Sequence, residues 1–111
     1  MIAELLLTAA LHTEPKPPTP LEARTYVAQR ASRDGWAGRQ WRCLDVLIKR
    51  ESGWNASAQS PTSSASGLFQ LLKLPKGLTV AQQYERGRRY ILSRYSSPCR
   101  ALEHSDRYGW Y

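Results

Sequence analysis

Apolar positions in the middle of the chain recur with the spacing of an α-helix. Trp41, Leu44 and Ile48 lie three and then four residues apart, which places them on one face of a helix predicted over about residues 38–51. Glu51 continues this face at the end of the helix. We therefore expect its carboxyl group to point into the domain or into a cleft.

A helix is also predicted before this one. Thr19, Pro20 and Glu22 have the spacing of an N-cap, a first helical residue and the acid of a capping box. We expect this helix to run to about Ser32 and to stop near Gly35.

A third helix is predicted from Thr79, where Gln82 completes a second capping box. Positions 80, 84, 87 and 91 then share one helical face. Ser97 and Pro98 break this helix and begin a last short one, which Gly109 ends.

The segment between the second and third helices is a loop. Gly53 ends the second helix, and residues 52–66 are polar and uncharged, with Ser, Asn, Gly and Pro favouring turns. A short apolar segment, Gly67 to Leu72, follows. The chain shows no internal repeat and no useful alternating strand pattern, so we predict a mostly α fold.

The first twenty residues differ from the rest. Residues 2–11 are apolar, and residues 13–20 contain four prolines, typical of an extended linker. The apolar stretch fits a signal-peptide core, although no Lys or Arg precedes it and Glu4 interrupts it. A short amphipathic helix or a misplaced start codon fits equally well. We expect a leader over residues 1–20 and one folded domain over residues 21–111.

Length and charge narrow the function. The 111 residues allow one ordinary domain, and 16 basic against 9 acidic residues give a net charge of +7. This charge favours an anionic partner: nucleic acid, a membrane surface or a wall polymer. Between Asp45 and Glu85 the only acid is Glu51. No apolar run approaches the length of a transmembrane helix.

The two cysteines, Cys43 and Cys99, are too few for a zinc site, and His12 and His104 are poorly spaced to complete one. In an exported protein the simplest interpretation is one disulfide; the alternative is two buried free thiols. We expect no metal and no organic cofactor.

Glu51 is the candidate for acid–base chemistry. The macrodipole at a helix C-terminus disfavours negative charge, and partial burial disfavours the carboxylate further. Both effects raise the pKa of a carboxyl group, and a carboxylic acid protonated near neutral pH is what a general acid requires. The alternative is a helix-terminal Glu that turns to solvent.

Several short motifs resemble those of lytic transglycosylases. They cover about residues 36–111 and comprise Glu51-Ser52-Gly53-Trp54-Asn55, Gly67-Leu68-Phe69-Gln70, Tyr90-Ile91 and the ending Gly109-Trp110-Tyr111. The combination is similar to a short transglycosylase-like domain of actinobacterial and bacteriophage proteins. The resemblance implies a small lysozyme-like domain, acting as a monomer outside the cytosol, in the cell wall or on a phage particle.

The resemblance also implies an activity. Glu51 would act as the single general acid and base that cleaves the β-1,4 bond between N-acetylmuramic acid and N-acetylglucosamine, leaving 1,6-anhydro ends. A lysozyme-type hydrolase generally needs a second carboxylate. The acids that the fold could bring near Glu51 are Asp45, Glu85, Glu103 and Asp106. Hydrolysis is therefore disfavoured but open.

The same resemblance implies supporting roles for several residues, and most of these residues also have a structural alternative. Ser52 and Ser66 would bond the sugar or Glu51, Gln70 would bind an N-acetyl group or brace the loop, and Tyr90 would donate to Glu51 or the substrate or pack in the core. Phe69 would serve as groove wall and core residue. Asn55 would fix a turn. Trp54 would stack on a sugar or pack the loop. Trp36, Trp41 and Trp110 are expected in the core, and His104 in a structural or exposed position.

Some residues depart from the family pattern, notably Ala56 and the arginines at 86, 88 and 89, which leaves the polymer preference open. Two rival functions remain. A non-catalytic wall-binding module would not need Glu51. A nucleic-acid binder would use the arginines of the last helices, but no recognised DNA or RNA motif accompanies them, so we expect no nucleic-acid partner.

Overall fold

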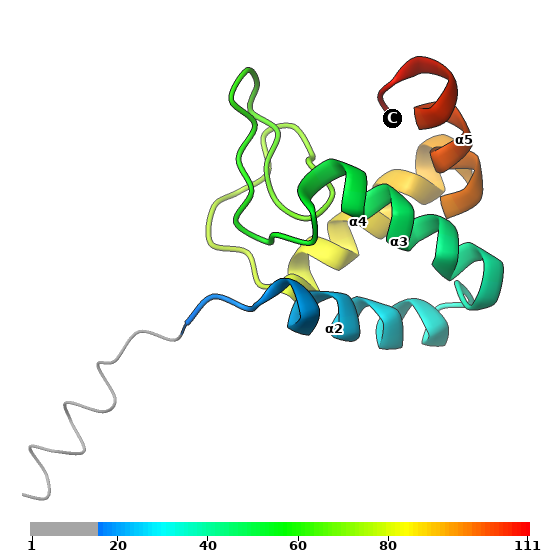
Figure 1. The fold of residues 1–111 in the computed structure, drawn as a ribbon, viewed down its shortest axis with the longest axis horizontal. Helices are drawn as coiled ribbons and strands as arrows, with labels where there is room; N and C mark the ends of the chain where they lie inside the picture. Colours follow the sequence, from blue (N-terminus) through cyan, green and yellow to red (C-terminus); the bar gives the residue numbers. More distant parts are fainter. Residues whose placement is uncertain (1–15) are drawn as a thin grey trace, which may run out of the picture.

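Four α-helices account for most of residues 16–111, the part of the chain that the computed structural model describes (Figure 1). They are α2 (Pro20–Arg33), α3 (Gly38–Ser52), α4 (Val80–Tyr95) and α5 (Pro98–Tyr108). The described residues contain no strand, only two isolated bridges in the loop between α3 and α4. The prediction of a mostly α domain is confirmed. The apolar stretch of residues 2–11 lies outside the described residues.

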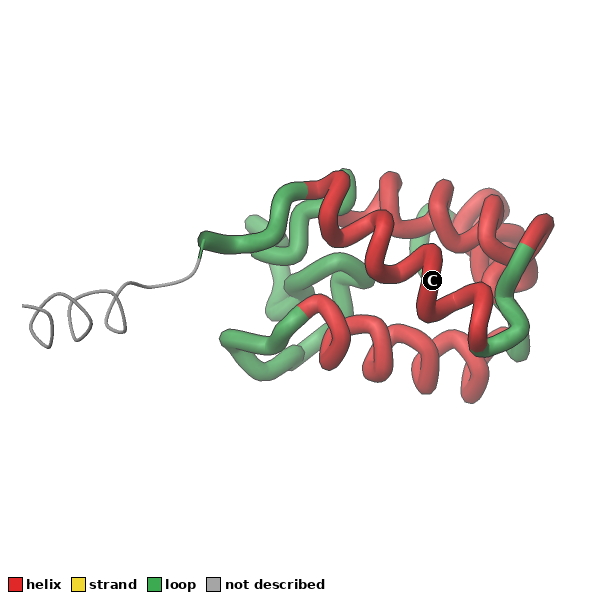
Figure 2. The backbone as a smooth tube through the Cα atoms, turned by 90° about the horizontal axis from the view of Figure 1, so that it is seen from below, coloured by secondary structure: helices red, strands yellow, loops and turns green. Residues whose placement is uncertain are grey.

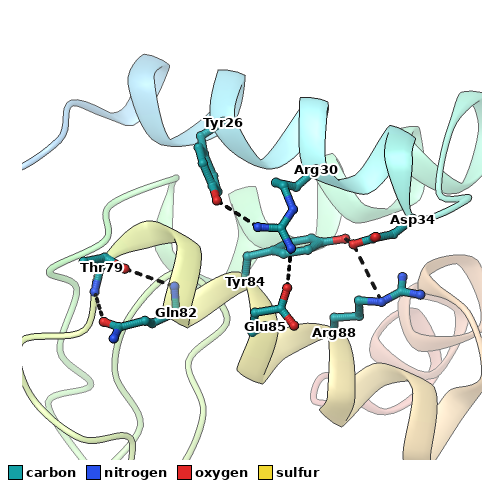
Figure 3. Close-up of polar contacts among 8 residues, drawn as sticks. All are labelled: Tyr26, Arg30, Asp34, Thr79, Gln82, Tyr84, Glu85 and Arg88. Carbon is teal, nitrogen blue, oxygen red and sulfur yellow. Dashed lines mark hydrogen bonds and ion pairs between the residues drawn. The ribbon is translucent and has the colours of Figure 1, made fainter.

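The predicted helix starts are also confirmed. The Thr19 hydroxyl accepts from the Glu22 amide at 3.1 Å, and the Thr19 amide donates to the Glu22 carboxylate at 3.0 Å. Thr79 and Gln82 make the same reciprocal pair at the start of α4 (Figure 3). These bonds satisfy amide groups that the first turn of a helix otherwise leaves without partners.

The helices contact one another in a ring. Helix α2 packs on α3, α3 on α5, α5 on α4, and α4 on α2. Helices α3 and α4 are therefore diagonal, without close backbone contact between them. The loop that joins them gathers at one end of the helices in both views (Figures 1 and 2). This arrangement leaves space between α3 and α4 that loop residues fill.

The core lies at the centre of this ring. Helix α3 contributes three fully buried aliphatic side chains, and α2 contributes small ones that let the helices approach closely. Tyr84 and Ile91 of α4 are fully buried, as the helical spacing predicted. The buried aliphatic residues of α2 and α3 are Ala23, Val27, Ala31, Leu44, Leu47 and Ile48.

Polar contacts join α2 to α4 (Figure 3). The Tyr84 hydroxyl donates to Asp34 at 2.8 Å, Arg30 pairs with Glu85, and Arg88 lies 3.8 Å from Asp34. Burial, and then the bond to Asp34, raise the pKa of Tyr84 above its ordinary value. The tyrosine therefore stays neutral and acts as a hydrogen-bond donor within the fold.

A disulfide joins Cys43 of α3 to Cys99 of α5, with 4.9 Å between the two Cα atoms. This confirms the expected pairing. The bond links the helix that carries Glu51 to the last helix, and its two cysteines are 56 residues apart in the chain.

None of the helices within residues 16–111 combines the length and the apolar character needed to cross a membrane.

Candidate functional site

The loop between α3 and α4 inserts two apolar side chains between these helices. Leu68 and Phe69 are almost completely buried. The Phe69 ring lies directly against Gly87 of α4, where an added Cβ would come within 2.4 Å of a ring carbon. Glycine is therefore needed at this helical position because the aromatic ring occupies the space of a side chain.

Hydrogen bonds hold this loop to both diagonal helices. The Ser52 hydroxyl, at the end of α3, donates to the Leu68 carbonyl at 2.8 Å. The buried Gln83 side chain of α4 accepts from the Leu68 amide at 2.8 Å and donates to the Ala56 carbonyl at 3.0 Å. Both the amide and the carbonyl group of Leu68 are thus hydrogen-bonded to helix side chains, one from α4 and one from α3.

A cleft of about 770 Å³ opens beside this loop. Its volume lies within the range of small-ligand sites, about 300–1,000 Å³. Four segments line it: the end of α3, the loop, one face of α4 and the chain after α5. The lining residues are Glu51; Gln70, Leu71, Leu72, Lys73 and Leu74; Arg86, Arg89, Tyr90, Ser93 and Arg94; and Gly109, Trp110 and Tyr111.

Among the described residues that line the cleft, Glu51 is the only one with a carboxyl side chain. It is partly buried, and this burial raises its pKa above the ordinary value, while the charge of Arg50 opposes the shift. Within residues 16–111 its carboxyl group makes no hydrogen bond or ion pair. Such a group holds its proton to higher pH than a solvated glutamate does, which suits a general acid.

The other acids of the described part are engaged elsewhere. Asp45 accepts from Arg24 at 2.8 and 2.9 Å and from the Trp54 indole at 2.9 Å. Arg50 pairs with Asp106. The remaining acids are Glu22 in its capping box, Asp34 and Glu85 between α2 and α4, and Glu103 at 4.0 Å from Arg107.

Two tyrosines connect the cleft to the end of the described chain. The Tyr90 hydroxyl donates to the Tyr111 carbonyl oxygen at 2.9 Å and accepts from Arg94 at 2.8 Å. The Tyr111 hydroxyl donates to the Phe69 carbonyl at 2.6 Å. Burial, followed by the charge of Glu51, raises the pKa of Tyr111 well above its ordinary value. Tyr90 therefore holds the chain end, which lines the same cleft as Glu51, and does not itself bond Glu51.

Gln70 lies in the cleft and also braces the loop. Its amide nitrogen donates to the carbonyls of Ala58 and Gly67 at 3.1 and 3.0 Å. Its carbonyl oxygen accepts no hydrogen bond from another described residue. This leaves an acceptor suited to the N–H of an N-acetyl group.

The structure brings Glu51, Gln70 and Tyr90 together in the cleft, but it does not place the other four candidates there. Ser52 bonds the Leu68 carbonyl, and Phe69 packs on α4. Asn55 accepts from the Ser57 amide at 2.9 Å, forming the expected turn. The backbone of Ser66 pairs with Leu71 at 3.2 Å. These residues shape the loop that borders the cleft.

Trp110 was expected in the core, and this was wrong. Its side chain is 54% exposed and lines the cleft. The residue follows the C-cap of α5, so no helix carries it inward, and its ring meets His104 edge-on at 4.5 Å. The His104 Nδ1 atom lies 2.9 Å from the Trp110 carbonyl oxygen, which gives this histidine a structural role. Trp54, by contrast, is buried and packs the loop against Trp41.

Apart from Tyr90, the face of α4 that lines the cleft was not recognised from the sequence. Positions 86, 89, 90, 93 and 94 follow the helical spacing of a single stripe, which is the signal that could have revealed it. The residues from Leu71 to Leu74 and those after Gly109 follow no regular period, so periodicity could not have placed them in the cleft.

Among residues 16–111, no group of three or more His, Cys, Asp or Glu side chains is placed to hold a metal ion. Comparisons with protein-family models, curated proteins and solved structures find no match to this chain.

Proposed function

We propose that this protein is a peptidoglycan lytic transglycosylase with a lysozyme-like domain and with Glu51 as its single general acid and base. The observation that carries the proposal is the isolation of Glu51. It is the one acid of the described residues without a polar partner, and it lies in a cleft of ligand size with its pKa raised. The motif resemblance around Glu51, Gln70 and Tyr90 supplies the substrate class.

In the proposed reaction, protonated Glu51 donates its proton to the oxygen that links muramic acid to glucosamine, and the bond from C1 to that oxygen breaks. The Glu51 carboxylate then accepts the proton of the muramoyl C6 hydroxyl. The C6 oxygen bonds to C1 and closes a 1,6-anhydro ring. One carboxyl group thus serves both steps, and the proton that it lost is restored.

The lack of a second carboxyl group in the described cleft lining favours this route over hydrolysis. Glycoside hydrolases generally place two carboxyl groups on either side of the scissile bond, one of them to activate water or to attack C1. Asp45 and Asp106 are held by arginines outside the cleft, so neither is positioned for that role.

The disulfide suits a protein that works outside the cytosol, where such bonds persist. We place the proposed enzyme in the cell wall or on a phage particle, acting as a monomer on glycan strands.

The substitution Glu51→Gln tests the acid–base role. We expect it to lower the rate of release of soluble fragments from purified walls by about a thousandfold, because it removes the proton donor and acceptor. The control is Glu103→Gln, which changes a solvent-exposed acid outside the cleft and should leave the rate unchanged. Circular dichroism should show both variants folded. A Glu51→Gln protein that still cleared walls at the wild-type rate would refute the proposal.

Mass spectrometry of the released glycans separates the possible reactions. Transglycosylation gives muramoyl ends about 18 Da lighter than the reducing ends produced by hydrolysis, because no water is added. Reducing ends alone would assign a muramidase instead. Binding to walls without any released fragment would assign a non-catalytic wall-binding module.

A further inference from the structure

Four cationic side chains line the cleft beside Glu51. Arg86, Arg89 and Arg94 project from one stripe of α4, and Lys73 comes from the loop. From Arg86 to Arg94 the stripe extends about 12 Å along the helix axis, at 1.5 Å per residue. The positive charge is therefore spread along the cleft.

Most of these cations lack the acidic partners that several arginines elsewhere in the described residues have. Within the described part of the chain, the side chains of Lys73, Arg86 and Arg89 make no hydrogen bond or ion pair, and Arg94 donates only to Tyr90. Arg24, Arg30 and Arg50 are each paired with an acid, in contrast. Like charges that share a cleft repel one another, and an anionic ligand would relieve this repulsion.

The distribution of charge around the cleft indicates the kind of ligand. The cations belong to α4 and the loop, whereas α3, the diagonal helix, contributes only Glu51, and the chain end contributes the exposed Trp110 ring. A ligand that fits both parts has neutral sugar rings and anionic groups repeated along one side. A polymer of phosphodiesters would instead bring negative charge to Glu51 as well.

We propose that Lys73, Arg86 and Arg89 form a subsite for carboxylates carried by the glycan strand, and that this subsite makes the enzyme prefer such strands to neutral glycans. The inference rests on the proposed function and adds the class of strand to it. The carboxylate has two possible sources: the lactyl group of a peptide-free muramic acid, or the stem peptide of a substituted one. Both present the same group to the arginines, which bind carboxylates in a fork geometry.

Binding to the Glu51→Gln protein tests this subsite without cleavage of the ligand. Calorimetric titrations would use three glycans of equal length: peptide-free muramoyl strands, strands with stem peptides, and chitin oligosaccharides as the neutral probe. We expect at least one carboxylated strand to bind about tenfold more tightly than chitin, with an affinity that falls as salt is added. The strand that binds tightly identifies the source of the carboxylate. Equal affinity for all three glycans would overturn the subsite.

The double substitution Arg86→Gln and Arg89→Gln, introduced into the same background, should remove this preference and leave chitin binding unchanged. The matched control is Arg42→Gln, an exposed arginine of α3 outside the cleft, which should retain the preference. If the double variant keeps the preference, the assigned residues are wrong. An oligonucleotide that binds the cleft more tightly than any carboxylated glycan, and loses that affinity in the double variant, would also overturn the proposal.

Cleavage assays separate this inference from the proposed function. In the active protein, the double substitution should raise KM for carboxylated strands about tenfold with little change in kcat, because the arginines bind the strand away from the reacting bond. An enzyme that cleaves all three glycans with equal KM retains the proposed function and loses the subsite. A protein that cleaves none of them, but binds carboxylated strands selectively, retains the subsite and loses the proposed function.

Discussion

If the proposed reaction takes place, Glu51 should determine its pH dependence, because only the protonated form of Glu51 can donate to the glycosidic oxygen. Burial raises its pKa above the ordinary value of 4.5, so the fraction of active enzyme should fall as the pH rises through this raised pKa. The charge of Arg50 acts in the opposite direction. We therefore expect Arg50→Gln to move the alkaline limb of the kcat/KM profile to higher pH.

The control is Lys49→Gln, which removes the neighbouring charge in the sequence. Lys49 does not contribute to the shift at Glu51, so this variant should keep the wild-type profile. If Arg50→Gln left the limb in place or moved it to lower pH, Glu51 would not be the group that titrates there.

For individual residues, the sequence predicts the position of Glu51 but only part of the residues around it. Helical spacing alone places Glu51 on the inner face of α3, and the local motif predicts the Asn55 turn. The hydrogen bond of the Ser52 hydroxyl could not be predicted. Its acceptor is a carbonyl 16 residues further along the chain, and the position of that carbonyl depends on the path of the loop.

Within the secondary-structure elements, Gln83 is the side chain that holds the loop to α4. We expect Gln83→Ala to lower the free energy of unfolding by about 1–3 kcal/mol, since it leaves the buried Leu68 amide and two loop carbonyls without partners. Thermal unfolding measures the loss, and amide exchange at Leu68 should accelerate. Gln82→Ala is the control: it changes the adjacent, exposed glutamine and affects only the helix cap, so its cost should be smaller and Leu68 should stay protected.

Gly87 allows a second test of how the loop packs on α4. Alanine is the better helix former by up to about 1 kcal/mol, but its Cβ would overlap the Phe69 ring. We expect Gly87→Ala to destabilise the protein by about 1–3 kcal/mol, the usual cost of overpacking. Chemical denaturation measures this difference.

A double-mutant cycle with Phe69→Leu shows whether the ring is the cause. In the presence of the smaller side chain, Gly87→Ala should cost less than it does alone. Additive effects of the two substitutions would show that they do not interact.

The helices themselves follow from local signals. Both capping boxes, the proline at the start of α5 and the glycine after it are interactions within a few residues, so the sequence predicts the element bounds closely. The cleft walls depend instead on how α4, the loop and the chain end meet in space. Short-range patterns carry little information about such contacts.

For the whole molecule, the disulfide connects the first half of the ring to its last helix. In the chain-entropy model, a bridge that spans 56 residues stabilises the fold by about 4 kcal/mol. Replacing both Cys43 and Cys99 with serine should therefore lower the melting temperature by roughly 20 °C. A reductant should destabilise the wild-type protein in the same way and leave the double-serine variant unaffected. Equal melting temperatures with and without reductant would show that the bridge does not contribute.

The position of Tyr111 has a practical consequence for anyone who produces this protein. Tyr111 forms part of the cleft wall and bonds the Phe69 carbonyl, whereas residues 16–19 are exposed and lead into α2 from outside the ring (Figure 1). Any chain that follows Tyr111 must leave from the rim of the cleft. Affinity tags, fluorophores and fusion partners are therefore better attached on the N-terminal side, because a group attached after Tyr111 would crowd the rim of the cleft.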